Sequence, residues 1–199
     1  MQSTVSKIEL ELKRRRRGKI YFADDFTSFG TAEAIKKALL RFEKSGMLIR
    51  LAHGIYLYPS IDTKLGLGVL YPSVESIAKE IARRDKARIV PTGLYALNVL
   101  GLSTQIPTNI VFHTDGAPRK IKVYNQTITF KHIVPKNLAY KNEILMLVVS
   151  AMKEIGEKVL TNNDLTIIQK TLSRETKENI LNDITLAPVW IRKKIQQII

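Results

Sequence analysis

The hydrophobic period changes at Gly46, and this change constrains the local fold more than any other feature of the chain. Before it, residues 31–45 are predicted to form a helix, because Thr31 can cap the N-terminus and Gly46 follows the end. One stripe of this helix is apolar and consists of Ile35, Ala38, Leu39 and Phe42. After it, residues 47–58 follow a period of two and turn at Ala52-His53-Gly54, which predicts a β-hairpin.

Three shorter elements are predicted upstream of this helix. The first is a helix that Thr4 or Ser6 caps and that ends near residue 17. A short β segment over residues 19–23 follows, and then a single helical turn over residues 24–30. The order helix, strand, helical turn, helix and hairpin predicts a winged helix-turn-helix over residues 1–60, a fold whose second paired helix enters a DNA major groove.

The remainder of the chain is predicted to form a second domain. Residues 61–72 contain Gly66, Gly68 and Pro72 but few charges, so they are interpreted as a linker. The fold class is therefore α+β: an N-terminal winged helix-turn-helix followed by a mixed α/β domain, residues 73–199, with a helical C-terminal part. The predicted elements of this domain are a helix from Ser73, a strand at 87–90, a helix at 92–100, antiparallel strands at 109–112, 121–124 and 127–134, and helices at 144–155, 164–172, 177–184 and after Pro188.

The charge balance indicates a polyanionic partner. The chain has 32 Lys and Arg against 18 Asp and Glu, a formal net charge of +14. It has no cysteine, which excludes disulfides and cysteine-based zinc or redox sites. The longest apolar stretch, residues 144–152, is far shorter than the roughly 20 residues that span a bilayer, and no export signal is recognisable, so a cytoplasmic protein is expected.

The N-terminal domain carries candidate contacts to double-stranded DNA. A helix that reads a groove needs an apolar stripe to seat it and cationic or hydrogen-bonding side chains on its outer face. A cluster of guanidinium groups repels itself unless phosphates neutralise it, and a hairpin tip can touch the DNA backbone. The alternatives are a solvated helix face, a solvated helix end and an ordinary turn. The candidates are Arg14, Arg15, Arg16, Arg17, Ser28, Thr31, Lys36, Lys37, Arg41, Arg50 and His53.

The second domain is basic as well, which suggests a second polyanion surface. The alternative is a surface whose charges serve solubility. The candidate residues of this second basic surface are Arg83, Arg84, Arg119, Lys120 and Lys122.

No catalytic constellation is recognisable in the sequence. The three histidines lack the spacing of paired metal ligands, and no HExxH, P-loop, GxGxxG or GxSxG motif occurs. A nuclease would need an acidic pair, whereas Asp115 near Lys120 and Lys122 supplies one carboxylate. We therefore expect no enzyme activity, no cofactor and no metal.

Several runs resemble the AbiEi-type antitoxins of type IV toxin–antitoxin systems. Gly18-Lys19-Ile20-Tyr21-Phe22, Asp24-Asp25-Phe26, Leu48-Ile49-Arg50 and His53-Gly54-Ile55-Tyr56 resemble the N-terminal winged helix of that family. Residues 88–93, 95–97, 101–103 and 104–107 resemble the start of its second domain. The resemblance extends over about residues 5 to 135.

This resemblance implies a cytosolic antitoxin that represses transcription. Its N-terminal domain would bind inverted repeats in its own promoter, with contacts from residues 28–41 and from the hairpin around Arg50 and His53. Residues 73–199 would counteract a nucleotidyltransferase toxin without forming a stable complex. Two alternatives are an RNA-binding or ribosome-associated module and a stand-alone transcriptional regulator without a toxin; a nuclease is a third.

Overall fold

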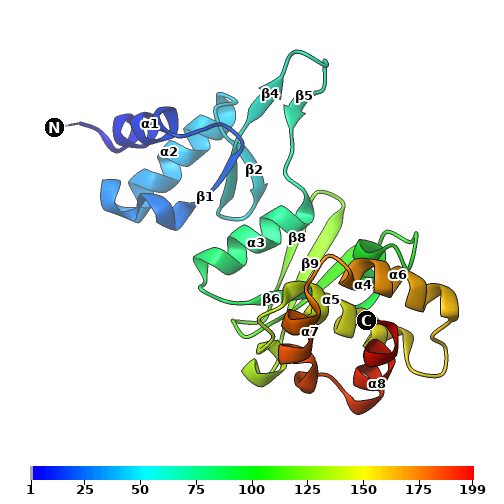
Figure 1. Cartoon of the computed structure of the whole chain (residues 1–199). Coiled ribbons are helices and arrows are strands. Elements are labelled where there is room, and N and C mark those ends of the chain that lie inside the picture. Colours follow the sequence, from blue (N-terminus) through cyan, green and yellow to red (C-terminus); the bar gives the residue numbers. More distant parts are fainter. Residues whose placement is uncertain (1) are drawn as a thin grey trace. The chain divides into compact units, whose positions relative to one another are not determined.

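The computed structural model describes residues 2–199, which form two compact units (Figure 1). The first unit extends to Glu80 and the second is Ile81–Ile199, so the division falls inside the helix α3 (Val74–Arg84). Both units combine helices with β-strands, which confirms the predicted α+β class.

The first unit follows the predicted order of elements. Thr31 caps α2 with its Oγ1, which accepts a hydrogen bond from the Ala34 amide (3.3 Å), as predicted. The elements are α1 (Thr4–Arg14), β1 (Lys19–Phe22), the 3-10 helix η1 (Ala23–Phe29), α2 (Ala32–Lys44), β2 (Ile49–Ala52), β3 (Ile55–Tyr58), β4 (Ser60–Asp62) and β5 (Gly68–Leu70).

The predicted cap of the first helix is wrong. Ser3 is the N-cap, and its Oγ accepts from the Ser6 amide (3.2 Å). The Thr4 hydroxyl instead donates to the Phe29 carbonyl (3.1 Å), so it fixes α1 against η1. The helix ends at Arg14, three residues before the predicted end, because Arg15 is already extended.

Strands β1, β3 and β2 form an antiparallel sheet in that order. The turn of the β2–β3 hairpin contains Gly54 with a φ of +71°, a conformation that side chains rarely adopt. The apolar stripe predicted for α2 is buried against the other elements of this unit. Its core contains Ile8, Leu12, Tyr21, Phe26, Ile35, Ala38, Leu39, Phe42, Leu48, Tyr56 and Tyr58.

The segment interpreted as a linker has structure of its own. Strands β4 and β5 pair as a second hairpin, with Ser60 opposite Leu70 and Asp62 opposite Gly68. Its loop is exposed, and the Leu65 amide donates to Asp62 Oδ1 (2.7 Å).

The second unit is built around a four-stranded sheet. Its elements after α3 are β6 (Ile89–Thr92), α4 (Gly93–Leu100), β7 (Asn109–Thr114), β8 (Arg119–Val123), β9 (Gln126–His132), the 3-10 helix η2 (Pro135–Leu138), α5 (Glu143–Ile155), α6 (Asn162–Leu172), α7 (Lys177–Asp183), the 3-10 helix η3 (Ile184–Leu186) and α8 (Val189–Ile198). The helical C-terminal part is confirmed, including the last helix after Pro188.

The strand order is β6-β7-β9-β8, and β7 runs parallel to β9. The expectation that all three later strands are antiparallel is therefore wrong for this pair. Strand β8 forms a tight hairpin with β9 and lies at the sheet edge, which leaves β9 between β8 and β7. One sheet face is apolar and buried, with Ile110, Phe112, Ile128 and Phe130. The other face carries mostly polar and charged side chains, among them His113, Thr129 and Lys131, together with Val90 and Val111.

Candidate nucleic-acid interface

Helix α2 presents its charged residues on more than one flank. Lys36, Lys37 and Arg41 are all exposed. A helix advances 100° per residue, so Lys36 and Arg41 lie about 140° apart around the axis. The predicted basic residues therefore lie on two different flanks of α2. The position of the β2–β3 hairpin shows which flank lies near another element.

Lys36 lies beside the tip of the β2–β3 hairpin. It lines a shallow groove of about 330 Å³ together with Arg50 and His53, whereas Arg41 does not. Arg50 Nη2 is 3.1 Å from His53 Nδ1. The structure thus brings three of the predicted contact residues together from two elements. We call this the α2–hairpin groove.

The floor of the α2–hairpin groove is apolar and its rim has mixed charge. Leu39 and Leu40 line it, and Leu40 is 48% exposed although it is a large hydrophobic residue. Asp24 and Glu43 contribute carboxylates beside the basic side chains. Such a groove offers an apolar contact, hydrogen-bond donors and acceptors within one small area.

Tyr56 supplies a phenol to the same groove. Burial raises the pKa of Tyr56, an effect that the positive charge of Arg50 partly offsets. The phenol is therefore protonated at neutral pH and can donate a hydrogen bond.

The four arginines at positions 14–17, at the end of α1, differ in whether they contact other residues of the protein. Arg15 Nε pairs with Glu11 Oε1 (2.8 Å). The Arg17 guanidinium lies 4.9 Å from the ring centre of Tyr58 and donates to the Pro59 carbonyl (3.3 Å). Arg14 and Arg16 are exposed and, within residues 2–199, form no ion pair. These two can reach an external phosphate without breaking a protein contact.

The remaining candidates lie near the start of α2. Thr31 uses its hydroxyl oxygen as the cap, and Ser28 is exposed on η1. Lys37 pairs with Glu33 (2.7 Å), but both side chains are 76% exposed. An exposed pair of this kind contributes little stability, so Lys37 can exchange its partner.

The structure separates the residues of the second basic surface. Lys120 and Lys122 are exposed on the polar sheet face, opposite Thr129 and Thr127. Arg119 points to the other face because side chains alternate along a strand. Arg119, Lys120 and Lys122 were predicted to form one surface because they are close in the sequence. The alternation of side chains along a strand could already have separated Arg119 from the two lysines.

Arg119 has a structural role in the second unit. Its guanidinium lies 5.4 Å from the ring centre of Phe130 and pairs with Asp85, which also pairs with Arg84 (2.9 Å). Burial lowers the pKa of Arg119, and the charge of Arg84 adds to this effect. Arg83 is exposed near the end of α3. Arg84 and Arg119 are therefore tied to Asp85, whereas Lys120 and Lys122 lie on the polar sheet face.

Asp115, the carboxylate considered for a nuclease, is held by Arg88. It accepts from the Arg88 amide (2.7 Å) and from Arg88 Nε (2.8 Å). No group of three or more His, Asp or Glu side chains in the described part of the chain could hold a metal ion. None of the helices within residues 2–199 is long and apolar enough to cross a bilayer.

Comparison with protein families places most of the chain in one group. A family model described as "Family of unknown function (DUF6088)" matches residues 7–180, which include elements of both units. A search of curated proteins found no match.

Proposed function

The chain belongs to the DUF6088 family, which has no assigned function, and we propose that it is a regulator that binds duplex DNA through α2 and the β2–β3 hairpin. The observation that carries this proposal is the α2–hairpin groove. There, Lys36 of α2 and Arg50 and His53 of the hairpin lie beside an exposed Leu40. In this arrangement a helix and a hairpin tip can contact the same stretch of DNA.

The first unit has the parts that a winged helix-turn-helix requires, and we propose that it is one. Helix α2 packs on α1 and η1 through its apolar stripe, which leaves its other side free for a major groove. Gly30 makes the tight junction between η1 and α2, because a Cβ there would lie 2.3 Å from Thr4 Oγ1. The β2–β3 hairpin, which follows α2, corresponds to the wing.

The chemistry of the groove suits base edges as well as phosphates. A lysine or arginine donates to guanine, a carboxylate accepts from the cytosine amino group, and an apolar side chain contacts the thymine methyl group. Lys36, Glu43 and Leu40 offer these three contacts. Arg14, Arg16 and Lys44 are exposed cations suited to phosphates. Duplex RNA is disfavoured, because its major groove is too narrow for a helix.

The test is fluorescence anisotropy with the full-length protein and a duplex of its own promoter. About six phosphate contacts would give a log–log salt slope near −5, since each contributes about 0.9. We expect the double substitution Lys36→Met, Arg50→Met to weaken binding at least tenfold. Lys64→Met removes an exposed charge in the β4–β5 loop and serves as the control. A salt slope near zero, or equal loss in the control, would contradict the proposal.

The antitoxin role that the AbiEi resemblance implies is a second proposal. The second unit has its own apolar core, as a domain with a separate activity requires. We propose that residues 73–199 counteract a nucleotidyltransferase toxin without forming a stable complex. Co-expression with the product of a neighbouring nucleotidyltransferase gene tests this through growth rescue. Absence of such a gene would favour the stand-alone regulator.

A further inference from the structure

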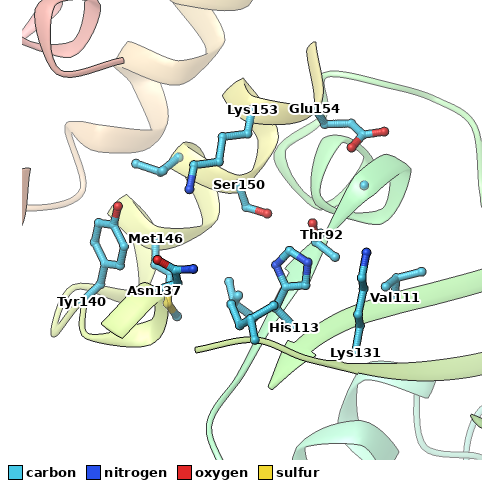
Figure 2. A pocket seen from close by; sticks show the side chains of 14 residues that line it. Thr92, Val111, His113, Lys131, Asn137, Tyr140, Met146, Ser150, Lys153 and Glu154 are labelled. Atoms are coloured by element: carbon cyan, nitrogen blue, oxygen red, sulfur yellow. The ribbon is translucent and has the colours of Figure 1, made fainter. Parts of the chain in front are cut away.

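A pocket of about 400 Å³ opens in the second unit, between α5 and the polar face of the sheet (Figure 2). All of its lining residues belong to Ile81–Ile199. It is therefore independent of the α2–hairpin groove and of the DNA-binding proposal.

The sheet and α5 place cations on opposite sides of this pocket. Val90, His113 and Lys131 lie directly opposite one another in β6, β7 and β9, so their side chains share one face. From α5, Met146, Val149 and Lys153 project into the same space, because residues three and four apart share a helix face. Figure 2 shows Lys153 reaching toward the pocket from α5, with His113 and Lys131 on the sheet side.

The two lysines of this pocket have no anionic partner within residues 2–199. Among the residues that the structure describes, neither Lys131 nor Lys153 forms an ion pair. Glu154 also lines the pocket but does not pair with either. Burial lowers the pKa of His113, and the charges of Lys131 and Lys153 lower it further. Two such cations beside a neutral imidazole favour a bound anion.

Tyr140 and the start of α4 line the same space. Tyr140 is 9% exposed, and its hydroxyl has no hydrogen-bond partner in residues 2–199. Thr92 is the N-cap of α4, although its side chain makes no capping hydrogen bond, and Thr92 and Gly93 line the pocket at the positive N-terminal end of this helix. The Glu154 carboxylate lies near the same end, because a Cβ on Gly93 would be 4.0 Å from its Oε2.

We propose that this pocket binds a small organic phosphate of the size of a nucleoside monophosphate. The phosphate group lies between Lys131 and Lys153, and the apolar part of the ligand packs on Met146, Val149 and Tyr140. The volume lies in the range of about 300–1,000 Å³ that small-molecule sites occupy and exceeds what inorganic phosphate alone would fill. The mixed lining, cationic at the rim and apolar at the wall, fits a ligand with both parts.

Isothermal titration calorimetry on the full-length protein tests this with AMP, GMP, CMP, UMP, adenosine, inorganic phosphate and succinate as probes. We expect at least one nucleotide to bind with a Kd below about 1 mM, and inorganic phosphate to compete with it. Adenosine and succinate should bind at least tenfold more weakly than that nucleotide. On binding, the His113 resonances should titrate at a higher pH, because the phosphate charge stabilises the imidazolium.

Matched variants locate the site. Lys131→Met and Lys153→Met should each weaken nucleotide binding at least tenfold, and Lys131→Arg should restore most of it. Lys120→Met removes an exposed charge from the same sheet face outside the pocket and should leave binding unchanged. Melting temperatures confirm that each variant is folded.

Three results would overturn the proposal. These are no binding of any nucleotide at about 5 mM, nucleotide affinity in Lys131→Met and Lys153→Met equal to that of the wild-type protein, and succinate binding as tight as the nucleotides.

Discussion

Arg50 donates to the His53 imidazole across the turn of the β2–β3 hairpin, with 3.1 Å between Nη2 and Nδ1. A guanidinium has no acceptor, so Nδ1 accepts and the ring proton lies on Nε2 in this contact. The contact holds both side chains at the hairpin tip, where they line the groove with Lys36. His53 therefore positions Arg50 as well as offering its own donor.

The two flanks of α2 should differ in what they contribute to DNA binding. Lys36→Met should cost about 1–3 kcal/mol on the cognate sequence and reduce discrimination between sequences, because Lys36 lies with Arg50 and His53. Arg41→Met should weaken all sequences alike, as a lost phosphate contact does. Anisotropy with cognate and scrambled duplexes measures both. Equal loss of discrimination in the two variants would show that the groove is not the reading surface.

Gly54 should be required for the hairpin. Its φ of +71° is strained for a branched side chain, although a Cβ at this position would have no heavy atom within 4 Å. Gly54→Val should therefore destabilise the first unit by about 1–3 kcal/mol through backbone strain. Gly54→Asn should cost less, because asparagine tolerates this region. Urea unfolding followed by far-UV circular dichroism tests the difference, and equal stability of both variants would argue against strain.

Arg119 and Lys120 are adjacent in the sequence but should differ in their effect on stability. Arg119→Met loses the contact with Phe130 and the pair with Asp85, and should lower the free energy of unfolding by about 1–2 kcal/mol. Lys120→Met should change it by less than about 0.5 kcal/mol, because the side chain is exposed. Denaturant unfolding measures both. A growth-rescue assay should test the second basic surface by charge reversal at Lys120 and Lys122. These substitutions leave the contacts of Arg119 in place and so avoid its loss of stability.

Stability should depend on pH through His113. Its pKa is lowered from 6.5 in the folded protein by burial and by Lys131 and Lys153. Between the lowered pKa and 6.5, the unfolded chain binds a proton that the folded chain does not, so stability rises with pH in this window. We expect the free energy of unfolding to fall as the pH drops below 6.5, and His113→Gln to reduce this slope. An unchanged slope in the variant would assign the dependence to other groups.

The local elements of the first unit were predictable because neighbouring residues determine them. Thr31 caps α2, the stripe from Ile35 to Phe42 is buried, and Gly54 forms the hairpin turn. Caps, turns and amphipathic stripes depend on interactions within a few residues of the chain. The same holds for the helices of the C-terminal part.

The pocket between α5 and the sheet of the second unit depends on contacts between residues far apart in the sequence. No local pattern shows that β9 lies parallel to β7, yet this pairing sets Lys131 directly beside His113. Lys153 lines the same pocket only because α5 packs beside β6. Strand order and helix packing are decided by which apolar faces bury one another, and that choice belongs to the whole unit. The sequence alone therefore determined the cap and apolar stripe of α2, the turn of the β2–β3 hairpin and the charge of this protein. The cap of α1, and the choice of which charges share a groove or a pocket, were decided by the tertiary structure, because both depend on packing between elements.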